Sequence, residues 1–170
     1  MFVISGLGCI ITCMADRIYI ETSVVSYLTS RLSTDLIVAA HQRLTQKWWQ
    51  ERAPHFRMLI SELVYREVAA GDAAAAPLRL EAIASLKNLT ITEEAVSLAD
   101  LLTAKGPIPR EHGVDALHIA IAAVNGIDYL LTWNCKHLAN AAHRSTIQSL
   151  VEGTGYVCPI ICTPEELMED

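Results

Sequence analysis

The sequence predicts an α/β fold: a three-layer α/β/α sandwich around a central, mostly parallel five-stranded sheet. Short apolar stretches alternate along the chain with longer helical stretches. This alternation favours parallel strands joined by crossover helices that cover both faces of the sheet. The chain has 170 residues, of which 52% are hydrophobic and 19% charged, and these values fit one compact domain.

The predicted elements follow one another without a low-complexity linker or an internal repeat. Strands are expected at residues 17–21, 57–60, 88–91, 128–132 and 156–162. Helices are expected at residues 23–30, 34–52, 61–70, 72–86, 92–105 and 114–125, with short helical turns at 135–140, at 143–152 and from Pro164 onward.

Local signals set the ends of the helices in the first half. Thr22 or Ser23 can cap the first helix through a side-chain oxygen. The second helix stops before Pro54, and the third stops at Gly71, a residue typical of helix C-termini. Pro77 falls near the first turn of the fourth helix, where proline is tolerated.

Similar signals mark the ends of the helices in the second half of the chain. Thr92 opens the fifth helix, which ends at Gly106, and a proline-containing loop follows over 106–113. The helix over 114–125 is almost entirely apolar, so we expect it to be central.

Residues 1–15 are apolar but too short to span a bilayer, and they lack the basic start of a secretion signal. We therefore expect an apolar N-terminal extension at 1–15 ahead of one domain at 16–170. Either Met14 is the native initiator, or residues 1–13 are an optional extension. The five cysteines form no Cys-x-x-Cys pair. Their odd number and the lack of a secretion signal favour reduced, buried thiols in a cytoplasmic protein, and no membrane partner is expected.

Acidic residues stand where the predicted topology would bring them to one rim. Glu21 ends the first strand, and ligands bind outside the carboxyl ends of strands in open α/β sheets. Asp115 opens the apolar helix, where it is either a cap or a site residue. Glu67 lies within the third helix, and on the residues alone Glu62 is an equal candidate. Glu21 taken singly also fits an acid favoured by a helix dipole.

Converging carboxylates repel one another unless a cation lies among them. Oxygen ligands suit Mg²⁺ or Mn²⁺, and such sites commonly serve phosphodiester hydrolysis. Thr132 and Asn134, at the end of the fourth strand, can add neutral oxygens or orient a water molecule. The net charge of −6 argues only weakly against a nucleic-acid substrate, because acids at a metal site contribute to it.

Four segments resemble, in the right order, the motifs of PIN-domain nucleases, of which VapC-type toxins are the largest group. The segments are Ile18–Ser23, Ser61-x5-Glu67-x3-Gly71, Val114–Ala120 and Leu130–Leu138. The resemblance covers about residues 16–165 and favours Glu67 over Glu62.

The resemblance implies a PIN-like sandwich and a Mg²⁺- or Mn²⁺-dependent endoribonuclease in the cytoplasm. It also implies a cognate antitoxin as partner and a homodimer. The metal ligands would be Glu21, Glu67 and Asp115, assisted by Asn134 and Thr132. Glu21 and Asn134 stand where the family usually has aspartate, so metal binding and activity are expected to be weaker.

Two rival functions stay open. One is a catalytically weak or inactive PIN domain that binds RNA or protein. The other is a different α/β phosphate-handling domain, such as a phosphatase or a receiver, but these need an aspartate where Glu21 stands. The sequence has neither a P-loop nor a dinucleotide fingerprint.

Several basic residues flank the acidic motifs. For His118, a buried and hydrogen-bonded ring is favoured over a catalytic base. Lys136 and His137 lie near the end of the fourth motif, and for Lys136 a solvated position is favoured over a phosphate contact. Arg110 and His112, in the loop before Asp115, are either substrate contacts or solvated groups.

Overall fold

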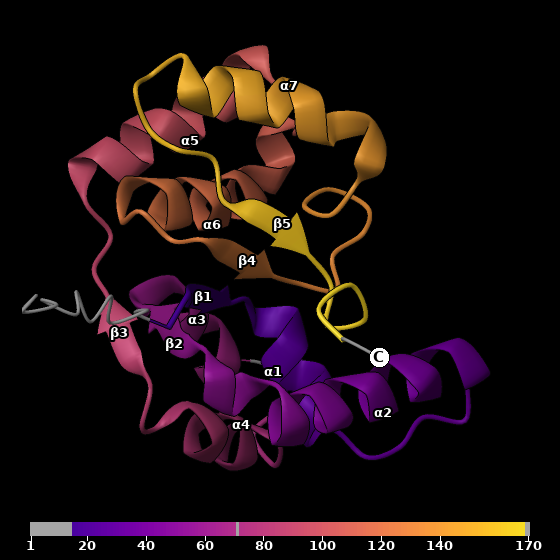
Figure 1. Cartoon of the computed structure of the whole chain (residues 1–170). Helices are drawn as coiled ribbons and strands as arrows, with labels where there is room; N and C mark the ends of the chain where they lie inside the picture. Colours follow the sequence, from indigo (N-terminus) through magenta and orange to yellow (C-terminus); the bar gives the residue numbers. More distant parts are fainter. Residues whose placement is uncertain (1–14, 71, 169–170) are drawn as a thin grey trace, which may run out of the picture.

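A five-stranded parallel sheet forms the centre of the molecule in a computed structural model, which describes residues 15–70 and 72–168 (Figure 1). The strands, in the spatial order β3-β2-β1-β4-β5, are β1 (Arg17–Ile20), β2 (Arg57–Ser61), β3 (Lys87–Leu89), β4 (Tyr129–Leu131) and β5 (Ile160–Cys162). Every neighbouring pair runs parallel. The predicted α/β class is confirmed, and the sheet is wholly rather than mostly parallel.

The helices form two layers around this sheet. They are α1 (Thr22–Thr29), α2 (Leu36–Glu51), α3 (Glu62–Ala69), α4 (Ala76–Ile83), α5 (Glu93–Lys105), α6 (Gly113–Val124) and α7 (Ala141–Glu152), with short 3-10 turns η1 (Ala53–His55) and η2 (Arg110–His112). Helices α1 to α4 gather on one side of the sheet and α5 to α7 on the other (Figure 1). The predicted three layers are therefore present.

The order of the strands creates a switch point between β1 and β4. The chain moves outward from β1 through β2 to β3, and then returns to place β4 on the other side of β1. Crevices at the carboxyl ends of strands beside such a reversal are the usual ligand sites of open α/β sheets.

Helix α6 is central, as its composition predicts. Its residues 118–123 are all buried, and Gly126 makes the turn that follows with a φ of +62°. Side chains disfavour that left-handed conformation, so a glycine here lets the chain leave α6 and enter β4 within a few residues.

Four predicted elements differ from the observed ones. Helix α4 is shorter than 72–86, because Asp72 accepts a hydrogen bond from the Ala74 amide at 2.9 Å and holds 72–75 in a turn. Strand β5 starts only at Ile160, because Pro159 has no N–H to donate to a ladder. Residues 135–139 and 164–167 form turns rather than helices.

The other predicted elements agree with the structure to within about two residues at each end. The extension at 1–15 with its initiator Met14, and the stop at Gly71, fall on residues 1–14 and 71, which lie outside the described residues. Cys162 is buried as predicted, but Cys135 is exposed, which contradicts the prediction of buried thiols. Among the helices described, none combines the length and apolarity needed to cross a bilayer.

Candidate metal centre

The candidate site lies at the carboxyl ends of β1, β2 and β4, at the switch point. Glu21 directly follows β1, and Thr132 and Asn134 follow β4. Helix α3, which begins where β2 ends, carries Glu67, and the first turn of α6 carries Asp115. The sheet topology thus brings the predicted residues to one region from four separate segments.

Glu21 is a buried carboxylate, only 7% exposed, held by hydroxyl groups. Its Oε2 accepts hydrogen bonds from Ser23 Oγ and, at 2.7 Å, from Thr132 Oγ1. The predicted capping of α1 by Thr22 or Ser23 is wrong, because Glu21 is the N-cap residue and no side chain caps the helix. The Thr22 hydroxyl instead donates to Glu67 Oε2.

Glu67, and not Glu62, faces Glu21. One carboxylate oxygen of Glu21, one of Glu67 and a ring nitrogen of His118 all lie within 4.8 Å of one another. Glu62 instead approaches Arg66 at 3.8 Å on the same helix. The structure therefore brings to Glu21 the acid that the motif resemblance favours.

The pKa of Glu67 lies below its ordinary value. Burial raises the pKa of this carboxyl, but the hydrogen bond and the charge of His118 and the hydrogen bond from Thr22 lower it by more. Glu67 is therefore held in its anionic form, the form that binds cations.

His118 links Glu67 to the core. The ring is 1% exposed, with Nε2 at 3.1 Å from Glu67 Oε2 and Nδ1 at 2.8 Å from the Tyr19 hydroxyl. Tyr19 in turn hydrogen-bonds Ser61 Oγ at 2.6 Å, and burial raises the pKa of its phenol. The favoured interpretation of His118, a buried and hydrogen-bonded histidine, matches this position. Tyr19 and Ser61 were not predicted from the sequence, although a buried tyrosine within a strand needs a polar partner for its hydroxyl group.

Asp115 joins the site through two side chains rather than directly. Its Oδ1 accepts a hydrogen bond from the side-chain Nδ2 of Asn134 at 3.0 Å. The backbone N–H of Asn134 donates to Thr132 Oγ1 at 2.9 Å. Thr132 then donates to Glu21. The group that contains Glu21, Glu67 and His118 does not include Asp115.

Asp115 groups instead with two histidines. Ligand atoms of His112, Asp115 and His137 lie within 4.8 Å of one another, and His112 Nδ1 is 4.0 Å from Asp115 Oδ2. The rings of His112 and His137 stack with their centres 4.0 Å apart. Desolvation lowers the pKa of His137, and the neighbouring His112 lowers it further.

The donor set fits a divalent cation. Among residues 15–70 and 72–168, each of the three acids accepts hydrogen bonds on one carboxylate oxygen only. These oxygens are Oε2 of Glu21, Oε2 of Glu67 and Oδ1 of Asp115. One oxygen of each acid is thus oriented by the protein while the other stays available, which is how outer partners orient metal ligands. Two carboxylates this close repel each other without a cation. The cluster is therefore compatible with a metal site.

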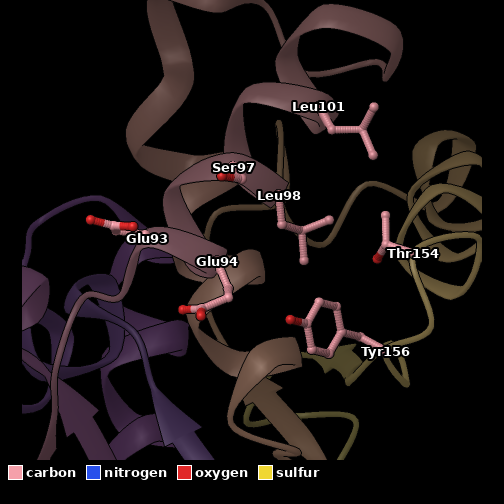
Figure 2. A pocket seen from close by; sticks show the side chains of 7 residues that line it. All are labelled: Glu93, Glu94, Ser97, Leu98, Leu101, Thr154 and Tyr156. Carbon is pink, nitrogen blue, oxygen red and sulfur yellow. The ribbon is translucent and has the colours of Figure 1, made fainter.

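A separate pocket of about 400 Å³ lies between α5 and the loop after α7 (Figure 2). Its lining contains Glu93, Glu94, Ser97, Leu98, Leu101, Thr154 and Tyr156. It shares no residue with the candidate metal centre, so the two features are distinct.

Comparisons with known proteins support the fold. No family model matches the chain, and no curated protein matches its sequence. Among solved structures, it is similar to VapC20 of Mycobacterium tuberculosis, a sarcin–ricin loop cleaving toxin, at 15% identity and a TM-score of 0.54 over 82% of this chain and 96% of that one. It is also similar to VapBC2 of Rickettsia felis bound to a promoter DNA fragment, at 12% identity and a TM-score of 0.52 over 86% and 98% of the two chains.

The chain therefore adopts a PIN-like α/β/α fold. Two of the structures that share this fold are those of VapC20 and VapBC2, which agrees with the family that the four motifs resemble.

Proposed function

We propose that this protein is a metal-dependent endoribonuclease that hydrolyses RNA phosphodiester bonds, as the toxin of a toxin–antitoxin pair. The observation that carries the proposal is that the carboxylates of Glu21 and Glu67 come together at the switch point of a PIN-like sheet. Asp115 is linked to Glu21 by hydrogen bonds through Asn134 and Thr132. The likeness of the fold to VapC20, a sarcin–ricin loop cleaving toxin, supports this class of reaction. The VapBC2 complex supports an antitoxin as partner, and the motif resemblance adds a homodimer.

In this proposal Glu21, Glu67 and Asp115 hold Mg²⁺ or Mn²⁺ through carboxylate oxygens. The cation, when bound, polarises the scissile phosphoryl group and offsets the charge that develops on it. The remaining residues position the acids: Thr132 orients Glu21 and Asn134 orients Asp115. Both oxygens already take part in hydrogen bonds: Thr132 Oγ1 accepts one from the backbone N–H of Asn134, and Asn134 Oδ1 accepts one from the backbone N–H of His137 at 3.1 Å.

One observation favours a second candidate, a PIN domain that binds RNA or protein without cleaving it. Asn134 supplies no charge, and its amide is committed to Asp115. With only three acids, and with Asp115 outside the tight group, the site would bind a cation more weakly than a four-acid site.

The deciding experiment is RNA cleavage by the purified protein in Mn²⁺ or in EDTA. We expect cleavage of single-stranded or structured RNA in Mn²⁺ only, and a loss of about 100-fold or more in Glu21→Gln and Asp115→Asn. Glu62→Gln is the matched control, because it removes an acid from α3 that does not face Glu21.

The variants also control for contaminating nuclease, since a contaminant would cleave equally in all preparations. Full Mn²⁺-dependent cleavage by Asp115→Asn would show that the site is assigned wrongly. Mn²⁺ binding by the wild type without any cleavage would identify the binding module instead.

A further inference from the structure

A second set of ligand atoms lies beside the carboxylates, and the proposed nuclease uses only one of its members. His112 ends η2, Asp115 lies in the first turn of α6, and His137 lies in the turns after β4. These segments come together only in the folded chain. A ring nitrogen of each histidine and a carboxylate oxygen of Asp115 lie within 4.8 Å of one another.

We propose that His112, Asp115 and His137 bind a transition-metal cation of the Zn²⁺ type, at a site separate from the carboxylates of Glu21 and Glu67. Two imidazoles and a carboxylate suit Zn²⁺, which takes nitrogen and oxygen ligands. Mg²⁺ prefers oxygen ligands alone, so the two sites differ in the metals they select.

The state of His137 points to a ligand. Its Nε2 is shielded from solvent and has no hydrogen-bond partner among the described residues. A shielded ring nitrogen without a partner is costly, and a bound cation would satisfy such a nitrogen.

The distances are close to those of a zinc site. Bond lengths of about 2.0–2.2 Å in a tetrahedral site put ligand atoms about 3.4 Å apart. His112 Nδ1 and Asp115 Oδ2 are 4.0 Å apart, so the side chains must come closer to one another to hold a common ion. Three protein ligands leave one position for water or another small ligand, as in open zinc sites.

Asp115 is already oriented for this role. Asn134 holds its Oδ1 at 3.0 Å, which leaves Oδ2 directed at His112. Hydrogen bonds of this kind to a ligating carboxylate fix its orientation and strengthen metal binding.

A regulatory consequence follows, and it rests on the proposed function. Asp115 belongs to both sites, so Zn²⁺ bound by the two histidines withdraws an acid from the set that holds Mg²⁺ or Mn²⁺. Zn²⁺ would then inhibit RNA cleavage, and removal of either histidine would relieve that inhibition.

The test begins with metal binding, which does not depend on cleavage. Calorimetry with Zn²⁺, and the visible absorption of Co²⁺ as a stand-in, would measure affinity in the full chain. We expect His112→Ala and His137→Ala each to weaken Zn²⁺ binding by at least about 10-fold. His55→Ala, which removes an exposed imidazole outside the cluster, should bind Zn²⁺ as the wild type does.

A comparison of metals separates this proposal from the nuclease. We expect the histidine variants to keep their Mn²⁺ affinity, and Glu21→Gln to lose Mn²⁺ binding while it keeps Zn²⁺ binding. Equal Zn²⁺ affinity in His55→Ala, His112→Ala and His137→Ala would overturn the zinc site, as would the absence of Zn²⁺ binding by the wild type. Zn²⁺ binding by a wild type that does not cleave RNA would refute the proposed nuclease activity and its inhibition by Zn²⁺, but it would still support the zinc site. Far-UV circular dichroism of each variant checks folding, and His137→Asn replaces His137→Ala if the latter unfolds.

Discussion

Glu21 shows how a single residue in this fold changes meaning with its surroundings. In the sequence it looks like an acid at the start of a helix, followed by two capping hydroxyls. In the folded chain the Thr22 hydroxyl donates a hydrogen bond to Glu67, and the Ser23 hydroxyl donates one to Glu21. The hydroxyl of Thr132, which follows β4, also donates to Glu21. The side chains that a local pattern assigns to helix capping therefore organise the candidate site.

At the same scale, Glu67 should make the stability of the metal-free protein depend on pH. Its folded pKa lies below the unfolded value near 4.5. A carboxyl of this kind stabilises the fold above its unfolded pKa, and the contribution is lost as the pH falls through the folded pKa. We expect the difference in unfolding free energy between wild type and Glu67→Gln to shrink once the pH falls below about 4.5. Urea titrations in EDTA measure it, and a difference that grows toward acid pH would contradict the prediction.

The sequence predicts Glu21 and Asp115 from their places at element ends, and the structure brings both to the switch point. It cannot choose between Glu67 and Glu62 by spacing, because both lie on α3, and only the motif resemblance separates them. The contacts that position these acids were not predictable. Tyr19, Ser61 and His118 are far apart in the chain, and their hydrogen bonds exist only after β1, β2 and α6 have packed.

At the scale of elements, α6 is the clearest example of composition that fixes a position. Ile119 is fully buried, while Val114 on the same helix is 47% exposed. We expect Ile119→Ala to lower the free energy of unfolding by about 2–5 kcal/mol, because it leaves a cavity in the core. Val114→Ala should change it by less than about 1 kcal/mol. Chemical denaturation of the two variants gives both values, and equal losses would mean that α6 is not packed as described.

Helix and strand types were predictable because apolar periodicity is a property of short stretches of sequence. The ends that were wrong depend on single atoms. Pro159 has no N–H to donate, so β5 begins only at Ile160. Asn134 Oδ1 accepts a hydrogen bond from the backbone N–H of His137, which holds this segment in turns. Such side-chain and backbone hydrogen bonds compete with regular structure at short range.

At the scale of the whole molecule, a cation that binds only the folded chain should stabilise it by mass action. We expect Mn²⁺ at about 100 times its Kd to add about 2.7 kcal/mol to the free energy of unfolding. For a chain of 170 residues this corresponds to a rise in Tm of roughly 5–10 °C. Thermal scans in Mn²⁺ and in EDTA should show the rise in wild type and Glu62→Gln but not in Glu21→Gln. An equal rise in all three would place the bound ion elsewhere.

The position of β4 beside β1 has a consequence for synthesis on the ribosome. A nascent chain that has produced β1, β2 and β3 still exposes the unpaired edge of β1, because its partner starts at Tyr129. Open edges of this kind invite association with other chains. The hydrogen bonds that link Asp115 to Glu21 can form only after Asn134 has left the ribosome. A translation product truncated before Tyr129 would therefore have an unpaired sheet edge that can associate with other chains, and no assembled site.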